Sequence, residues 1–323
     1  MKLRLSVFAV LVAGFAFGSA QAQTKWDMPT PYPDSNLHTK NVKLFADDIK
    51  AATGGKLELV VHSNASLIKH PDIKRAVQTA QVNIGELLIS VLSNESPLYA
   101  FDSNPFLAAN YGAAKKLWTV ARPYIEKRFD SQGIKLLYSV PWPPQGIYTK
   151  KPLNSVADLK GTKFRTYSPN TSEFAKQIGA VPTTVQVPEV PQAFITGTVD
   201  AMITSGATGV DTQAWDYLKY YYDTEAFLPH NVVIVNKAAF AKLDPAVQKA
   251  VMDAAAKAEE RGWAVSAAEN QGYMKTMASK GIIVEKPNAK LLAELNAIGK
   301  TMAQQWVSKT GPDAQAILNE YGR

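Results

Sequence analysis

The chain has 323 residues, of which 46% are hydrophobic and 20% are charged, and its formal net charge at pH 7 is +7. A chain of this length buries enough apolar surface to be stable without covalent cross-links, and we expect about two domains. Cysteine is absent, which excludes a disulfide framework, a thiolate nucleophile and a thiolate metal site. Basic residues are spread along the chain and are not interleaved with aromatic ones in a patch, so we expect no nucleic-acid partner.

The N-terminus has the order of features of a secretory signal peptide. Lys2 and Arg4 form a positive start, residues 7–17 are an apolar run, and residues 20–22 (AQA) offer the small-x-small pattern that signal peptidase cleaves. The apolar run is short for a permanent membrane span, although an uncleaved anchor is the alternative. We therefore expect a mature protein that begins near Gln23 and lies outside the cytoplasm.

The elements after the signal peptide alternate between strand and helix patterns. Residues 25–28 predict a short strand, and Ser35 or Asn36 can cap a helix over 37–52 that ends at Gly54-Gly55. Strands are also expected at about 56–62, 82–84, 133–139, 146–149, 162–166, 199–203 and 231–235, with a helix over 71–80. Strands that alternate with helices at this spacing indicate a parallel α/β sheet.

A long helix is predicted from about 246 to 278. This stretch follows Asp244-Pro245, contains no proline and is rich in Ala, Glu and Lys, a composition that favours a helix. Its length would allow it to run along two domains and brace them. The chain has no Gly/Ser linker, so we expect crossing strands to join the domains.

Catalytic signatures are missing from the sequence. Ser205-Gly206 follows a predicted strand without the flanking glycine pattern of a nucleophile elbow. The four histidines show no metal-ligand spacing, and no phosphate-binding loop or dinucleotide fingerprint occurs. We therefore predict no catalytic residue, metal or cofactor, and keep a secreted α/β hydrolase or lyase that acts on an organic acid as the alternative.

Two motifs stand close together in the middle of the chain. Residues 158–165 read DLKGTKFR, and residues 189–201 read EVPQAFITGTVDA. In this order, with the signal peptide and the long helix, they resemble the DctP-type solute-binding proteins of tripartite ATP-independent periplasmic (TRAP) transporters. The resemblance covers essentially the whole mature chain, although a motif such as LKGxKxR also occurs in other periplasmic binding proteins.

This resemblance implies an α/β, two-lobed periplasmic binding protein fold of a type II-like kind. It places a ligand cleft between hinged lobes, which the long helix near the C-terminus braces. We expect lobe 1 to contain residues 23–142 and about 231–270, and lobe 2 to contain residues 143–230 and about 271–323, after a signal peptide over 1–22. The function implied is capture of a small organic acid and its delivery to TRAP membrane subunits, without enzymatic activity. We expect a monomer, and a sensor that docks on a receptor kinase is an open alternative.

The resemblance also implies that Arg165 pairs with a ligand carboxylate. A guanidinium group offers a planar fork of donors that matches a carboxylate, while an interlobe or surface ion pair is the alternative. Many relatives that bind sialic acid or C4-dicarboxylates have a second cleft arginine, and that place falls near Gln145 in this chain. Because Gln145 carries no charge, we expect a ligand with a single carboxylate.

Other candidates for the site surround these two residues in sequence or follow predicted strands. Trp142, Tyr148 and Phe164 could form an apolar wall for the ligand, with core packing as the alternative. Polar contacts are expected from strand ends, where ligands of α/β proteins usually lie. These candidates are Thr204 and Ser205, with Thr208 nearby, and Tyr32 and Glu86 from the first lobe. The run Tyr220–Tyr222 and Trp215 are interpreted as helix packing, although Trp215 could reach the cleft.

Overall fold

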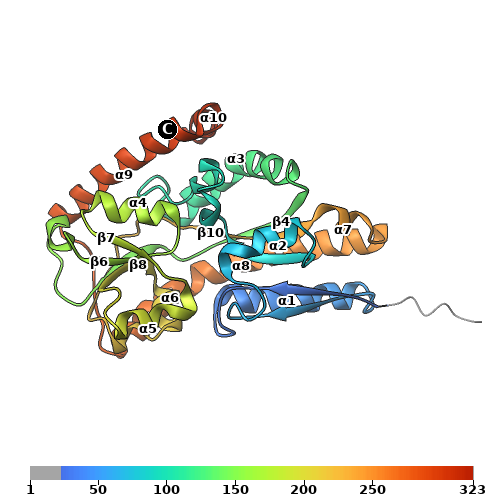
Figure 1. Cartoon of the computed structure of the whole chain (residues 1–323), viewed down its shortest axis with the longest axis horizontal. Helices are drawn as coiled ribbons and strands as arrows, with labels where there is room; N and C mark the ends of the chain where they lie inside the picture. Colours follow the sequence, from blue (N-terminus) through green and yellow to red (C-terminus); the bar gives the residue numbers. More distant parts are fainter. Residues whose placement is uncertain (1–22, 323) are drawn as a thin grey trace, which may run out of the picture.

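A computed structural model describes residues 23–322 of the chain. Two α/β lobes lie side by side along the longest axis of the molecule (Figure 1). The predicted signal peptide lies outside the described residues. Between residues 23 and 322, no helix is both long and apolar enough to cross a membrane.

The first lobe combines two small sheets. Its strands are β1 (Thr24–Pro29), β2 (Leu57–His62), β3 (Ile84–Leu88), β4 (Ile134–Pro141) and β10 (His230–Asn236). Its helices are α1 (Leu37–Ala52), α2 (Ile73–Gln78), α3 (Tyr111–Asp130) and α7 (Lys237–Ala241). β1 pairs with β2, β10 stands between β3 and β4, and β1 also lies beside β3.

The second lobe is built on one 6-stranded sheet. Its strands are β5 (Gln145–Thr149), β6 (Lys163–Thr166), β7 (Val181–Thr184), β8 (Ala201–Ser205), β9 (Tyr220–Tyr222) and β11 (Ile283–Glu285). They follow the order β11-β9-β5-β8-β6-β7. Its helices include α4 (Pro169–Gln177), α5 (Val190–Ile195) and α6 (Gly206–Asp211). The interpretation of Tyr220–Tyr222 as helix packing was wrong, because these residues form strand β9.

Both lobes contain parallel and antiparallel strand pairs, whereas the sequence indicated a parallel sheet. β1–β2, β6–β7, β6–β8 and β9–β11 are parallel, but β10 runs antiparallel to β3 and β4, and β5 runs antiparallel to β8 and β9. The two antiparallel strands are those that the chain enters from the other lobe. β5 and β10 each enter a lobe from the direction of the other lobe, so each runs antiparallel to its neighbours in the sheet.

Two crossing segments join the lobes, as the absence of a linker predicted. One leads from β4 through Trp142 to β5, and the other leads from β9 through Pro229 to β10. They run side by side, since the Trp142 N–H donates to the Pro229 carbonyl at 2.7 Å and the Ala226 N–H donates to the Gln145 carbonyl at 2.9 Å. Both crossing points therefore lie next to each other, which is the geometry of a hinge.

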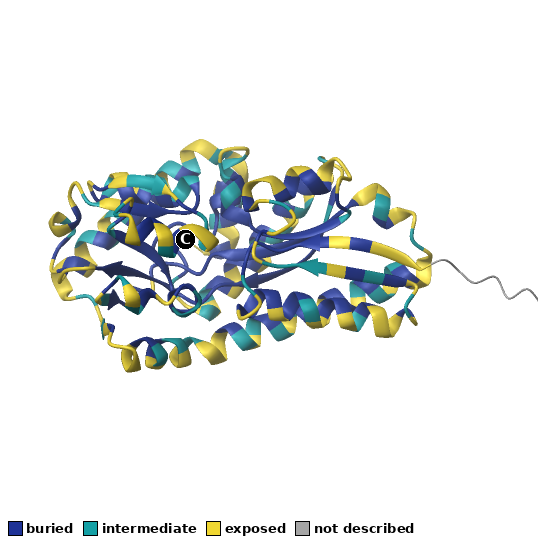
Figure 2. Ribbon diagram, turned by 60° about the horizontal axis from the view of Figure 1, so that its bottom comes forward, coloured by how far each residue is buried: buried dark blue, intermediate teal, exposed yellow. Residues whose placement is uncertain are grey.

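The predicted bracing helix is α8 (Pro245–Ser279), which has 35 residues and a length of about 50 Å. It packs on α1 and β4 in the first lobe and on α6 and β11 in the second (Figure 1). Buried residues make up most of the central strands and the inward faces of the helices, while the outer faces of the helices are exposed (Figure 2). The expected α/β, two-lobed fold with a long bracing helix is confirmed.

The helices after α8 contact both lobes. In α9 (Ala289–Thr310), Leu291 and Leu295 lie in the core of the second lobe, whereas Trp306 lies in the core of the first. Helix α10 (Pro312–Tyr321) packs on α3. We therefore propose that residues 312–321 belong to the first lobe, although the predicted division grouped them with the second.

Candidate functional site

A buried cavity lies where the two lobes meet. Its free volume is about 20 Å³, well below that of an open ligand pocket, so the two lobes enclose it tightly. Both lobes and both crossing segments supply its wall. The lining residues are Tyr32, His70, Leu88, Trp142, Gln145, Arg165, Tyr167, Gln186, Val187, Thr204, Thr208 and Pro229.

Arg165 is the only cation with a permanent charge among these lining residues. Its side chain is held in place by the Nε–H, which donates to the Val185 carbonyl at 2.9 Å, and its guanidinium lies 5.0 Å from the centre of the Tyr167 ring. Only 1% of its surface is exposed. Within residues 23–322, Nη1 and Nη2 are buried without any hydrogen-bond partner. The outer edge of the guanidinium fork is thus free inside the cavity.

The electrostatics of the cavity favour an anion. Burial lowers the pKa of Arg165 to about 10, yet the group keeps its charge at neutral pH. No carboxylate is among the lining residues. His70 adds no charge, because burial lowers its pKa to about 4. A buried charge without a partner costs several kcal/mol, so a ligand that brings one negative charge is strongly favoured.

The sequence matches the DctP family model, described as bacterial extracellular solute-binding protein, family 7, over residues 30–310. The chain belongs to this family. Among solved structures, DctP7 of Bordetella pertussis, an extracytoplasmic solute receptor that binds pyroglutamic acid, is 54% identical with a TM-score of 0.92, covering 93% of this chain and 100% of that one. A marine metagenome TRAP solute-binding protein specific for pyroglutamate is 41% identical, also with a TM-score of 0.92, covering 93% and 99% of the two chains.

A more distant DctP relative is the 2,3-diketo-L-gulonate-binding periplasmic protein YiaO of Escherichia coli, which is 24% identical over 88% of each chain. These relatives are named as solute receptors or solute-binding proteins and not as enzymes. The predictions of a DctP-type solute-binding protein for an organic acid, without enzymatic activity, are therefore confirmed. The hydrolase or lyase alternative is not favoured.

The cavity of this DctP protein brings together most of the polar residues predicted for the site. Arg165, Gln145 and Thr204 line it from the second lobe, together with Thr208, and Tyr32 lines it from the first. Trp142 contributes from the crossing segment, where its indole faces the Tyr32 ring edge-on at 4.9 Å. The role of these residues in ligand binding remains a prediction.

Gln145 lies in the cavity wall, but its side chain is already engaged with the protein. Its Nε2 donates to the Pro143 carbonyl at 3.0 Å, and its Oε1 accepts from the Tyr167 hydroxyl at 3.0 Å. It therefore orients Tyr167. A neutral, occupied amide at this place agrees with the predicted single-carboxylate ligand.

The structure places Tyr148 and Phe164 in the cores of the second lobe and outside the cavity wall. Phe164 packs on Phe174 at a ring distance of 6.3 Å, and the Tyr148 hydroxyl donates to the Ser205 carbonyl at 3.0 Å. Strand alternation explains the position of Phe164, because successive side chains point to opposite faces and Arg165 takes the cavity face. Trp215 is likewise absent from the cavity wall, and Lys280 lies 5.9 Å from its ring.

Ser205 and Glu86 have structural contacts instead of cavity positions. The Ser205 hydroxyl caps α6 by accepting from the Thr208 N–H at 3.2 Å. Glu86 is buried inside the first lobe, where Thr30 donates to its Oε2 at 2.5 Å and His38 lies 3.8 Å away. Burial raises the pKa of Glu86 to about 7 and lowers that of His38 to about 3. We do not include either residue in the proposed ligand contacts.

Sequence reasoning missed Tyr167, His70 and Gln186. Tyr167 could have been found, because it lies two residues after Arg165 and so shares its side of the chain. His70 and Gln186 meet across the lobes, with 3.0 Å between Nδ1 and Oε1. His70 Nε2 accepts the Leu88 N–H at 3.0 Å, so in the neutral ring Nδ1 carries the proton and donates to Gln186. This hydrogen bond connects the two lobes beside the cavity.

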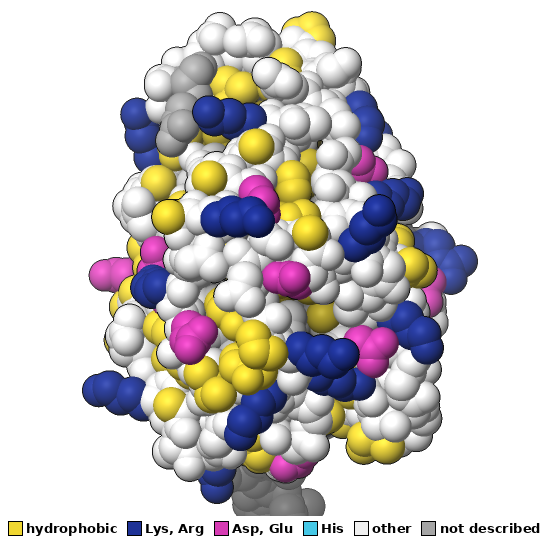
Figure 3. Space-filling view, turned by 90° about the vertical axis from the view of Figure 1, so that its left-hand side faces the viewer, with side chains coloured by type: hydrophobic (Ala, Val, Ile, Leu, Met, Phe, Trp, Pro, Cys, Tyr) yellow, Lys and Arg dark blue, Asp and Glu magenta, His cyan; other side chains and the backbone are white. Residues whose placement is uncertain are grey.

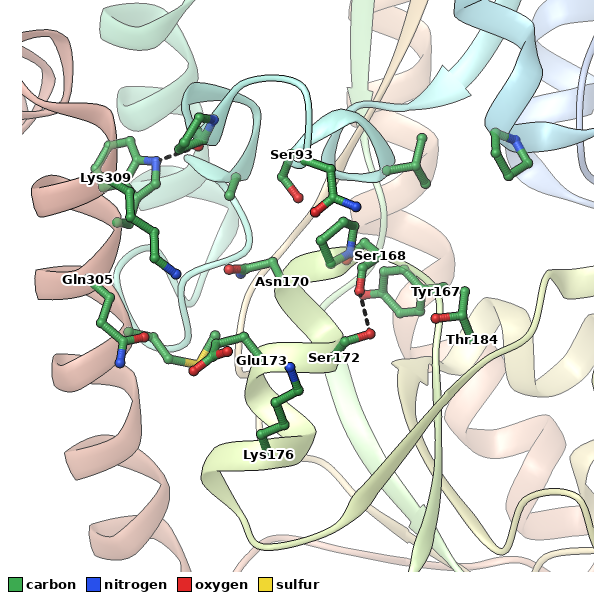
Figure 4. A pocket seen from close by; sticks show the side chains of 18 of the residues that line it. Ser93, Tyr167, Ser168, Asn170, Ser172, Glu173, Lys176, Thr184, Gln305 and Lys309 are labelled. Carbon is green, nitrogen blue, oxygen red and sulfur yellow. Dashed lines mark hydrogen bonds between the residues drawn. The ribbon is translucent and has the colours of Figure 1, made fainter.

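A wider, more polar groove adjoins the cavity on its outer side. Tyr167 and Gln186 line both spaces. In Figure 4, Ser93 approaches from the first lobe, Asn170 and Lys176 from α4, and Lys309 from α9. Its lining is solvent-facing and mixed in charge, whereas the cavity holds the buried unpaired guanidinium. The cavity is therefore the better candidate for the ligand site.

Proposed function

We propose that this DctP protein binds a cyclic monocarboxylate of the pyroglutamate type. The observation that carries this proposal is the pair of unpartnered, buried Arg165 Nη atoms in a cavity that has no carboxylate of its own. A ligand carboxylate can accept from both atoms at once, which is the strongest arrangement for this pair of groups. Support for the ligand class comes from the 54% and 41% identical relatives that bind pyroglutamate.

The charge balance supports one carboxylate and not two. Arg165 is the sole permanently charged group among the lining residues of the cavity, and Gln145 beside it is neutral. A second ligand carboxylate would be buried without a cation, at a cost of several kcal/mol. Dicarboxylates should therefore bind much more weakly than monocarboxylates.

Closure of the lobes accompanies binding in this proposal. The ligand contacts come from both lobes, and the wall residues Tyr32 and Arg165 are 2% and 1% exposed. A ligand cannot reach so enclosed a space unless the lobes separate at the crossing segments. Since the ligand contacts both lobes only when they meet, it favours the closed state, which the membrane subunits would recognise.

We further propose that the protein acts in the periplasm as a monomer, and that it delivers its ligand to TRAP membrane subunits. The signal peptide features of residues 1–22 and the extracellular family support this location. On the end face of the second lobe, basic and acidic side chains are interspersed (Figure 3). That face thus lacks the uniformly basic surface that nucleic-acid binding needs.

A thermal-shift screen tests the proposal. Mature protein is heated with pyroglutamate, lactate, pyruvate, proline and succinate, and co-purified ligand is sought by native mass spectrometry. Pyroglutamate should raise the melting temperature most, because a ligand that binds only the folded state stabilises it, and NMR should recover it unchanged. Stabilisation by succinate alone would contradict the single-carboxylate proposal, and chemical conversion of the ligand would support an enzyme.

A further inference from the structure

The donors and acceptors of the hydrogen bonds around the cavity can be assigned from groups that can only donate or only accept. The Trp142 Nε1–H lies 2.9 Å from Asn231 Oδ1. An indole nitrogen can only donate, so the Asn231 atom that faces it must be the amide oxygen. This contact fixes the orientation of the Asn231 side chain.

The fixed amide determines what Tyr32 can offer to a ligand. Its hydroxyl lies 3.1 Å from the same Asn231 Oδ1. Because this oxygen can only accept, the single phenolic proton of Tyr32 must point at Asn231. The part of the Tyr32 oxygen left for the cavity is therefore a lone pair, and Tyr32 can serve a ligand only as an acceptor.

The same reasoning applies to Tyr167. Gln145 Nε2 faces the Pro143 carbonyl, which can only accept, and this contact fixes the Gln145 amide. Its Oε1 then faces the Tyr167 hydroxyl, which must donate. Tyr167 is thus a second phenol whose proton is committed to the protein and whose oxygen can only accept.

The donors of the cavity come from other groups. Arg165 supplies Nη1 and Nη2, and Gln186 keeps its Nε2 hydrogens because its Oε1 is taken by His70. A lactam acid has matching groups, since its carboxylate and ring carbonyl accept while its ring N–H donates. The acceptor-only phenols are suited to that N–H.

We propose that Tyr32 and Tyr167 select ligands that carry an N–H donor, and that Asn231 and Gln145 impose this selectivity by holding the two phenolic protons. The inference rests on the proposed function and adds a specificity rule to it. If an oxygen replaced the ring N–H of the ligand, its lone pair would face the lone pair of a phenolic oxygen, and no hydrogen bond could form. The site should therefore reject the isosteric γ-lactone acid.

Isothermal titration of the wild-type protein with pyroglutamate and with its γ-lactone analogue tests the rule, with NMR to show that the lactone stays intact. Loss of the hydrogen bond and burial of an unpaired acceptor predict about 10- to 100-fold weaker binding of the lactone. Affinities that agree within about threefold would overturn the rule and leave the proposed function standing. If neither compound binds, the proposed function itself is overturned.

The variants Tyr32→Phe and Tyr167→Phe connect the rule to the two phenols. At least one of them should lower pyroglutamate affinity about threefold to tenfold and keep the cooperative melting of the parent. In that variant the preference, which is the Kd of the lactone divided by the Kd of pyroglutamate, should fall close to one. Tyr124→Phe is the matched control, because that hydroxyl contacts Glu320 outside the cavity, and it should keep the full preference. A preference unchanged in both cavity variants would overturn the proposed role of the phenols.

Discussion

Replacing Arg165 with alanine is expected to abolish most ligand affinity while leaving the fold intact. The substitution removes two buried donors that have no partner within residues 23–322, together with one hydrogen bond to the Val185 carbonyl. Truncating one partner of a buried charged pair costs about 2–5 kcal/mol, which corresponds to roughly 30- to 4,000-fold in Kd. Without ligand, the loss of an unpaired buried charge offsets the lost hydrogen bond, so the melting temperature should change by no more than about 4 °C.

Isothermal titration with pyroglutamate measures the effect of Arg165→Ala directly. Arg165→Lys should fall between the wild type and the alanine variant, because a lysine keeps the charge but loses the planar fork. Arg75→Ala is the matched control, since that arginine lies on the surface and contacts Asp72 at 3.3 Å. Binding within threefold of the wild type in Arg165→Ala would refute the anchor, provided that the control behaves as the parent.

Three further tests, which use four substitutions, address the packing and electrostatics of the scaffold. Glu86→Gln should flatten the pH dependence of stability, because the pKa of Glu86 rises from 4.5 to about 7 in the folded protein. The wild type should therefore lose stability relative to the variant as the pH rises from about 4.5 to about 7. Melting temperatures that change in parallel across this window would contradict the raised pKa. His70→Ala should cost about 1–3 kcal/mol by leaving the Leu88 N–H without its acceptor, as measured by urea unfolding, and no loss would mean that water replaces the ring. In α8, Gly262→Ala should destabilise the protein by about 1–3 kcal/mol, because the new Cβ would lie 2.3 Å from a valine methyl. In Gly272→Ala, in the same helix, the new Cβ meets nothing within 4 Å, so this variant should be more stable by about 0.5–1 kcal/mol. Equal effects at both sites would refute the close packing of α8.

Local signals predicted the parts of the fold that depend on neighbouring residues. Helix α1 begins after Asn36, whose side chain accepts the His38 N–H at 2.8 Å, and it ends before Gly54, which has a φ of 59°. Both features are visible in the sequence as a capping residue and a glycine stop. The long helix α8 was equally readable from its composition and its lack of proline.

The site was predictable where one residue carries the chemistry by itself. Arg165 was identified from its motif, and its position in the cavity agrees with the strand alternation that separates it from Phe164. The aromatic wall was harder to predict, because a hydrophobic ring suits a core as well as a ligand pocket. For Tyr148 and Phe164 the sequence left both possibilities open, and neither residue is among those that line the cavity.

Contacts between residues far apart in the chain could not be read from the sequence. His70 and Gln186 are 116 positions apart, and Asn231 reaches Tyr32 across 199 positions. Each of these pairs depends on how the two crossing segments place the strand ends. No local pattern of the sequence contains that information.

A crystal structure of the mature protein with pyroglutamate tests the central claim most directly. We expect closed lobes with the ligand in the buried cavity and its carboxylate oxygens within hydrogen-bond distance of Arg165 Nη1 and Nη2. A ligand that occupies only the outer groove near Asn170 and Lys309, with the Arg165 fork still unpaired, would contradict it.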